Sequence, residues 1–306
     1  MPAFSTHYIF AKELLPFVEE TADFNVNEDA VFVGTQGPDI FFFHRIMPWQ
    51  FGKSLSKAGS MLHRAKPCSI FEAMKSYCEN IPSPDTAKSY VYGFMMHYAL
   101  DRKCHPFVYS LQDKMTDENH FLNPHTAHNT IELSADCCML NKRMKQEKPY
   151  LFRTSDTIND DNKISSEIGR LWEYVMPASI GIKITEKQGA QAVKDTKAVQ
   201  KILLDKYSLK KIIARPLEFA VSPITKNFRI TSMLRPKDLE KAEKYVNINR
   251  EKWLSPYSHK EFCDSFEDLF EQALEEAKIM LLRFQAGDDC ADITDNLSFL
   301  TGVEVK

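Results

Sequence analysis

Residues 83–105 read SPDTAKSYVYGFMMHYALDRKCH and predict a helix from residue 84 to about residue 104. Ser83 is expected to cap this helix with Pro84 in its first turn, and Pro106 is expected to end the helix just after Cys104. The residues from 91 to 100 are mostly apolar. This pattern indicates a helix whose middle is buried in the protein core.

The same helix contains His97 and Asp101, which are four residues apart. That spacing places an imidazole and a carboxylate on one face, within reach of a common ion. A single pair of this kind is more often a surface ion pair or a hydrogen-bonded core histidine. Here the surroundings are apolar, so a buried carboxylate needs a specific partner. His105 follows one turn later.

A second helix with the same pattern is predicted from Asn123-Pro124 to about residue 147. It contains His128 and Glu132, again four residues apart, while His125 is expected at the surface or behind the ligands. Two such pairs on neighbouring helices are more informative than one. Histidine with carboxylate is the ligand set typical of catalytic zinc, whereas structural zinc sites more often use thiolates.

Most of the remaining chain also has helical periodicity. A first helix begins near His7, Asp39 follows the turn made by Gly37 and Pro38, and the stretch from 49 to 66 looks irregular. Further helical patterns lie at 69–79, 165–175, 186–207, 209–219, 236–246 and 262–284.

These patterns predict an all-α fold, a single-domain multi-helix bundle. We expect residues 1–150 to form a metal-binding helical core and residues 151–306 to add helices to the same domain. The acidic tail from residue 288 is expected to be a loosely attached end.

Composition excludes several classes of protein. The 306 residues carry a formal net charge of −3, so a dedicated binder of duplex nucleic acid is not expected. Seven cysteines, an odd number, do not suggest a disulfide framework. The start of the chain does not resemble a secretory signal, and apolar runs are too short for a transmembrane helix. We therefore expect a cytoplasmic protein with at most transient membrane contact; the oligomeric state stays open.

The order of candidate ligands along the chain resembles that of the zinc-dependent phospholipase C family, whose fold is shared with the fungal single-strand-specific nucleases. The resemblance covers about residues 3 to 140. It rests on Thr6-His7, Gly37-Pro38-Asp39, His63, His97-x-x-x-Asp101, His105 and His128-x-x-x-Glu132.

This resemblance implies a site for two or three zinc ions. Asp39, His63 and His97 would bind one ion, and Asp101 would bridge it to a neighbouring ion that His7 helps to bind. A third ion would be held by His105, His128 and Glu132. Asp39 also stands where the family has been assigned a general base.

One departure from the family concerns the N-terminus. Secreted members use the backbone amine of a mature N-terminal Trp as a ligand, and this chain has no Trp there. We hypothesise that removal of Met1 exposes the Pro2 amine as a substitute. Intact-mass measurement that finds Met1 in metal-loaded protein would exclude this hypothesis.

The function implied is hydrolysis of a small-molecule or lipid head-group phosphodiester, because clustered divalent cations offset the repulsion between an anionic phosphate and an anionic nucleophile. Two alternatives stay open. One is a nuclease or nucleotidase on the same scaffold, which would need aromatic platforms for bases. The other is a metal-binding module without catalytic activity.

Several further residues are ambiguous from sequence. His44 and His120 lack a carboxylate at helical spacing and are expected at the surface or behind the ligands. The run Phe41–Phe43 is more typical of a core than of a lipid pocket. Trp253 could cap the mouth of the site or anchor a loop to the helical body.

Overall fold

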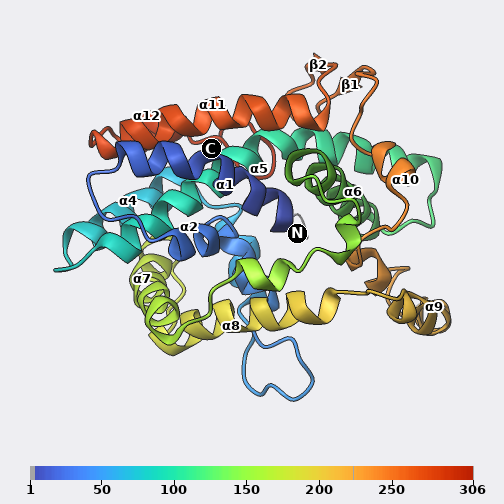
Figure 1. Cartoon of the computed structure of the whole chain (residues 1–306), viewed down its shortest axis with the longest axis horizontal. Helices are drawn as coiled ribbons and strands as arrows, with labels where there is room; N and C mark the ends of the chain where they lie inside the picture. The colour runs from blue at the N-terminus through green and yellow to red at the C-terminus, as the bar shows by residue number, and fades with distance from the viewer. Residues whose placement is uncertain (1–3, 223, 306) are drawn as a thin grey trace.

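The computed structural model describes residues 4–222 and 224–305 and consists almost entirely of helices (Figure 1). This confirms the predicted all-α fold. The α-helices are α1 (Phe4–Thr21), α2 (Glu28–Gly34), α3 (Ser56–Leu62), α4 (Pro67–Glu79), α5 (Asp85–Glu118), α6 (Pro124–Met144), α7 (Asn162–Ile180), α8 (Glu186–Leu203), α9 (Leu209–Val221), α10 (Leu239–Glu243), α11 (Phe266–Gln285) and α12 (Cys290–Thr294).

Shorter elements connect these helices. The 3-10 helices are η1 (Gly37–Phe43), η2 (Pro149–Leu151), η3 (Thr154–Thr157) and η4 (Ile230–Met233). Strands β1 (Trp253–Leu254) and β2 (Glu261–Phe262) form a small antiparallel hairpin, with Trp253 opposite Phe262. Within the described residues, no helix is both long enough and apolar enough to cross a membrane.

Helix α5 is the centre of the fold. Helices α1, α2, α6 and α11 all pack on it, and Figure 1 shows α11 and α5 running side by side along one edge of the molecule. The middle of α5 is buried, including Phe94, Met95 and Met96. Because apolar side chains surround this middle, polar groups on the same helix are held away from bulk water.

Two glycines let α2 approach α5 closely. A Cβ atom on Gly93 would lie 2.1 Å from the carbonyl oxygen of Val31, and one on Gly34 would lie 2.2 Å from that of Tyr90. Neither position therefore has space for a side chain. The close packing fixes η1, which follows α2 directly, against the buried middle of α5.

The sequence predicted the start of α5 to within one residue but was wrong about its cap and its end. Ser83 does not cap the helix, because the residue at the cap is Pro84, which makes no side-chain capping bond. Pro106 does not end the helix, which continues to Glu118. A proline inside a helix costs about 3 kcal/mol, and packing of α5 against α6 and α11 outweighs this local cost. Helix α6, in contrast, begins as predicted, with the Asn123 side chain accepting from the His125 backbone N–H.

Two other segments differ from expectation. The stretch from 49 to 66, predicted to be irregular, contains α3. The tail is not loosely attached, because Phe299 is completely buried and the Tyr98 hydroxyl donates to the carbonyls of Thr294 and Leu297. Both segments are organised by contacts with distant parts of the chain, and a local pattern contains no sign of these.

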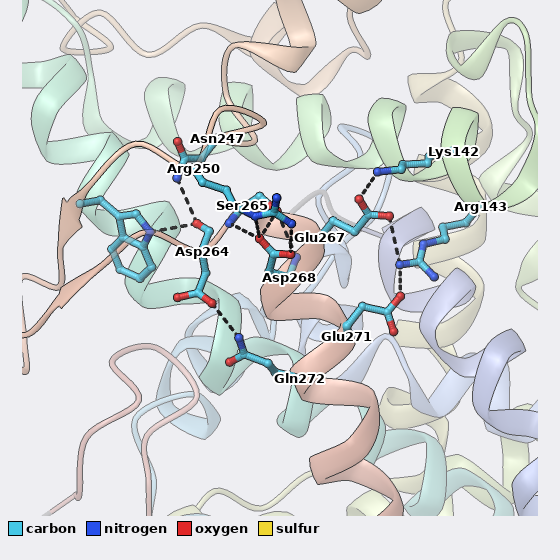
Figure 2. A network of polar contacts seen from close by, with 11 residues as sticks. Lys142, Arg143, Asn247, Arg250, Asp264, Ser265, Glu267, Asp268, Glu271 and Gln272 are labelled. Carbon is cyan, nitrogen blue, oxygen red and sulfur yellow. Dashed lines mark hydrogen bonds and ion pairs between the residues drawn. The ribbon is translucent and has the colours of Figure 1, made fainter.

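The later helices pack directly on the earlier ones. Helix α7 packs on α4, and α8 packs on η1. Figure 2 shows the polar contacts that join α11 to α6, where Arg143 meets Glu267 and Glu271. In the same view Asp268 pairs with Arg250 through two contacts of 2.8 Å, so the loop before α11 is also tied to the helix.

Candidate metal centre

Four helical elements and a helix end bring eight titratable side chains together in the interior. The three residues of α5 lie on successive turns of one face, and α6 supplies two more. Each of the eight is at most 9% exposed. They are His7 of α1, Asp39 of η1, His63 at the end of α3, His97, Asp101 and His105 of α5, and His128 and Glu132 of α6.

Asp101 lies at the centre of this cluster. Its Oδ1 is 3.2 Å from His7 Nε2, and its Oδ2 is 3.0 Å from His97 Nε2. Oδ2 is also 3.6 Å from His105 Nδ1 and 3.8 Å from His63 Nε2. One carboxylate thus faces imidazoles that come from three separate helical segments.

The other two carboxylates, Asp39 and Glu132, contact different histidines of the cluster. Asp39 Oδ1 lies 3.2 Å from His63 Nε2. Glu132 Oε1 lies 3.2 Å from His128 Nε2 and 3.4 Å from His105 Nε2.

Three groups of donor atoms can therefore each surround one ion, with the donor atoms in each group within 4.8 Å of one another. The groups are His7, His97 and Asp101; Asp39, His63 and His97; and His105, His128 and Glu132. The resemblance assigns the same eight residues, but it places His97 only with Asp39 and His63.

The hydrogen bonds of three imidazoles indicate which ring nitrogen of each is free to bind a metal ion. Nδ1 of His63 lies 2.8 Å from the Gly59 carbonyl oxygen, that of His97 3.0 Å from the Thr35 carbonyl and that of His105 2.8 Å from the Phe299 carbonyl. A carbonyl oxygen only accepts, so Nδ1 carries the proton when the imidazole is neutral. The lone pair is then on Nε2, which is the usual state of a metal-binding histidine.

Nε2 of His97 and Oδ2 of Asp101 are consequently two acceptors only 3.0 Å apart. Such a pair repels unless a cation or an additional proton lies between the atoms. Donor atoms around one zinc ion are about 3 Å apart, given zinc–ligand bonds of about 2 Å. His7 Nδ1, Asp39 Oδ1 and His97 Nε2 are buried without a hydrogen-bond partner among the described residues. The donor set and its spacing fit divalent zinc.

The electrostatics of the cluster favour cations. Burial alone would raise the pKa of Asp101, but His105, His97 and His7 hold it well below its usual range. Burial likewise lowers the pKa of His105, yet the carboxylates of Asp101 and Glu132 raise it to about 9. The carboxylates thus create a negative potential that stabilises positive charge within the cluster.

Gly37 lies directly against the imidazole ring of His97. Gly37 has a φ of +53°, and a Cβ atom there would lie 2.2 Å from His97 Cδ2. The turn that aims Asp39 therefore also leaves room for the imidazole. The sequence indicated the turn but not its contact with His97.

Asp136 supports the site and was missed by the sequence prediction. Its Oδ1 accepts from the backbone N–H of Thr6 at 2.8 Å and from the Thr6 hydroxyl at 2.7 Å. Arg235 approaches its other oxygen at 3.5 Å. These contacts fix the start of α1 next to His7. The available signal was the position of Asp136, four residues after Glu132 on the same helix.

The structure also places the other candidate histidines. His120 and His125 are exposed, outside the cluster. His44 is completely buried instead of lying at the surface, and its Nδ1 accepts from the Leu55 backbone N–H at 3.1 Å. His44 therefore stabilises the loop between η1 and α3. The Pro2 amine lies outside the described residues.

Aromatic residues surround the cluster. Phe41 and Phe43 are buried in the core, as predicted. The ring centroid of Phe42 lies 5.5 Å from that of His63. Trp253 anchors its loop, since its indole N–H donates to the Asp264 carbonyl at 3.0 Å. Tyr109 lies nearer the cluster, with its ring 5.1 Å from that of His128.

Fold and site together define a helical protein with a buried cluster of residues that could hold divalent cations. The chain belongs to the zinc-dependent phospholipase C family, whose family model, described as zinc dependent phospholipase C, matches residues 6–177. The match includes all eight side chains of the cluster. Searches of curated proteins and of solved structures gave no match. The family and the three groups of ligand-type residues support a zinc-dependent hydrolase.

Proposed function

We propose that this protein is a zinc-dependent phosphodiesterase that hydrolyses phospholipids in the manner of a phospholipase C. The observation that carries the proposal is the continuous cluster around Asp101, where three groups of ligand-type side chains share one buried space. Bound zinc would polarise the phosphoryl oxygens and activate water at neutral pH.

The eight side chains would divide the work as follows. His63 and His97 would bind one ion with Asp39, and Asp101 would bridge to the ion held by His7. His105, His128 and Glu132 would hold the third. The carbonyls of Gly59, Thr35 and Phe299 orient three of these imidazoles, which is the usual way in which outer contacts fix a ligand's tautomer.

Asp39 is the proposed general base. Its Oδ1 faces His63 at 3.2 Å, which leaves Oδ2 to accept a proton from the attacking water. The water oxygen adds to phosphorus, and the bond between phosphorus and the glycerol oxygen breaks. That oxygen takes up a proton, so the products are diacylglycerol and a phosphorylated head group.

Hydrolysis of a short-chain phosphatidylcholine in isotopically labelled water tests this proposal. We expect diacylglycerol as one product and the label in the phosphorylated head group. Asp39→Asn should lower turnover per bound zinc by a factor of about 10² to 10⁴. Asp195→Asn is a matched control, because Asp195 is also buried but binds the Arg45 backbone and the Gln50 and Gln191 side chains away from the cluster.

Two results would contradict the proposal. Cleavage of a single-stranded oligonucleotide without cleavage of any lipid would favour a nuclease. Zinc-loaded protein that hydrolyses no phosphodiester would favour a metal-binding module.

A further inference from the structure

Helix α9 presents apolar side chains to solvent. Phe219 is 84% exposed, and Ile213 and Leu217 are about two-thirds exposed. Apolar residues on a surface helix normally face the core. The exposed apolar side chains of α9 and its continuation are Leu209, Ile212, Ile213, Leu217, Phe219, Val221, Ile224 and Ile230.

The polar side of α9 faces the protein instead. Glu218 is only 9% exposed, and its Oε2 accepts from the Thr231 hydroxyl at 2.8 Å. Lys211 donates to the Arg235 carbonyl at 2.9 Å. The helix is therefore held to the body by its polar groups, and its orientation is the reverse of that of an ordinary surface helix.

The charge of this region differs from that of the whole chain. Residues 205–230 contain six Lys and Arg but two acidic residues, whereas the chain has a formal net charge of −3. Glu218 is buried, and Asp205 accepts from the backbone N–H groups of Lys210 and Lys211. The cationic side chains of Lys206, Arg215 and Arg229 are exposed. The surface around the apolar side chains is thus positive.

We propose that α9 docks the protein on an anionic phospholipid surface. Exposed apolar side chains flanked by basic ones are the chemistry of a helix that lies in the membrane interface. A second copy of the chain fits less well, because two equally positive surfaces would repel each other. The inference rests in part on the proposed function, since a phospholipid substrate is found in such a surface.

The position of α9 supports a link to the site. Figure 1 shows α9 at one end of the molecule, beyond the end of α8. The segment after α9 is bonded to the first turns of α6. Thr126 Oγ1 accepts from the Arg229 N–H at 3.0 Å, and Asn129 donates to the Ser232 hydroxyl at 3.2 Å. These residues flank His128, so docking through α9 would bring the third group of ligands toward the lipid.

Sedimentation with phosphatidylcholine vesicles, with and without phosphatidylserine, tests the proposal on the full zinc-loaded chain. We expect binding that requires phosphatidylserine and weakens with salt. The variant Ile213→Ser/Leu217→Ser/Phe219→Ser should lower the partition coefficient by about tenfold or more. The control Ile279→Ser/Leu282→Ser changes exposed apolar residues of α11 and should bind like wild type.

A charge variant gives independent evidence that does not depend on the apolar substitutions. Arg215→Gln/Arg229→Gln should weaken binding to phosphatidylserine vesicles, whereas Lys12→Gln/Lys163→Gln, at exposed positions on α1 and α7, should not. All four variants should hydrolyse a water-soluble phosphodiester at the wild-type rate.

The outcomes separate docking from catalysis. Wild-type protein that binds no vesicles, or an apolar variant that binds like wild type, would overturn the docking proposal even if soluble diesters are hydrolysed. A dimer that the apolar variant dissociates, without vesicle binding, would overturn it too. Vesicle binding without hydrolysis of any diester would contradict the proposed function and leave docking intact.

Discussion

At His97, each ring nitrogen has one specific neighbour. Nδ1 lies 3.0 Å from the Thr35 carbonyl oxygen, and Nε2 faces Asp101 at 3.0 Å. In this orientation the single lone pair of Nε2 points toward the carboxylate and can bind one ion. The His97 ring fits in this place because Gly37 has no side chain.

Gly37→Ala should therefore damage stability and zinc binding together. The positive φ of +53° costs a non-glycine residue about 1–2 kcal/mol, and the new methyl group would displace His97. Thermal unfolding and zinc titration measure the two effects.

Gly181→Ala is the matched control for this substitution. Its φ is +70°, but a Cβ there has no atom within 4 Å, so it should lower stability without changing zinc affinity. Wild-type zinc affinity in Gly37→Ala would contradict this account of His97.

At this scale the sequence predicted which side chains come together better than it predicted the residues that support them. The eight residues contain imidazole and carboxylate groups, and five of them belong to helices in which the spacing of four repeats. Asp136 was missed because its partner, Thr6, lies 130 residues away in the chain. Hydrogen bonds between distant segments leave no periodic pattern in a sequence.

Among the elements, the C-terminal tail has the most direct effect on the site. The Phe299 carbonyl oxygen lies 2.8 Å from His105 Nδ1, and its ring lies 5.8 Å from that of His63. The tail thus contacts histidines of two different ligand groups, although its sequence pattern predicted a loose end.

Phe299→Ala should lower stability by about 3–5 kcal/mol and zinc affinity by about tenfold or more. Phe270→Ala removes an equally buried ring that packs on Phe10 in α1, so it should cost similar stability but leave zinc affinity unchanged. Equal zinc affinities in the two variants would show that the tail does not organise the site.

Helix periodicity was sufficient to find the main helices but not their ends. Pro106 is a strong local stop signal, yet α5 continues through it because its partners α6 and α11 extend along it. Segments such as α3, whose seven residues span two turns, depend on tertiary contacts that a local pattern does not contain.

For the whole molecule, we propose that residues 1–150 and 151–306 form one folding unit. Helix α7 covers α4, α8 covers η1 and α11 covers α5, so the early helices have buried faces that the later ones complete. The full chain should then unfold in a single transition. A fragment of residues 1–150 should show no cooperative unfolding and bind no stoichiometric zinc; a cooperatively folded fragment would contradict the proposal.

Removal of zinc should destabilise the whole protein. Zinc that binds the folded chain and not the unfolded one stabilises the folded state, and chelation removes this contribution. A ligand at a thousand times its dissociation constant contributes about 4 kcal/mol per site, so chelation should lower the unfolding temperature by several degrees or more. Added zinc should restore it, and an unchanged unfolding temperature after verified metal removal would contradict this expectation.

The most direct test of the metal centre is the zinc content per chain of wild type, Asp101→Asn and the control Asp195→Asn, measured by elemental analysis. The three groups predict two or three zinc ions in wild type and in the control. Asp101→Asn should lose at least one, because Asp101 faces histidines of all three groups. Wild-type protein purified without chelator that holds no stoichiometric metal, or an Asp101→Asn variant with full zinc content, would contradict the account.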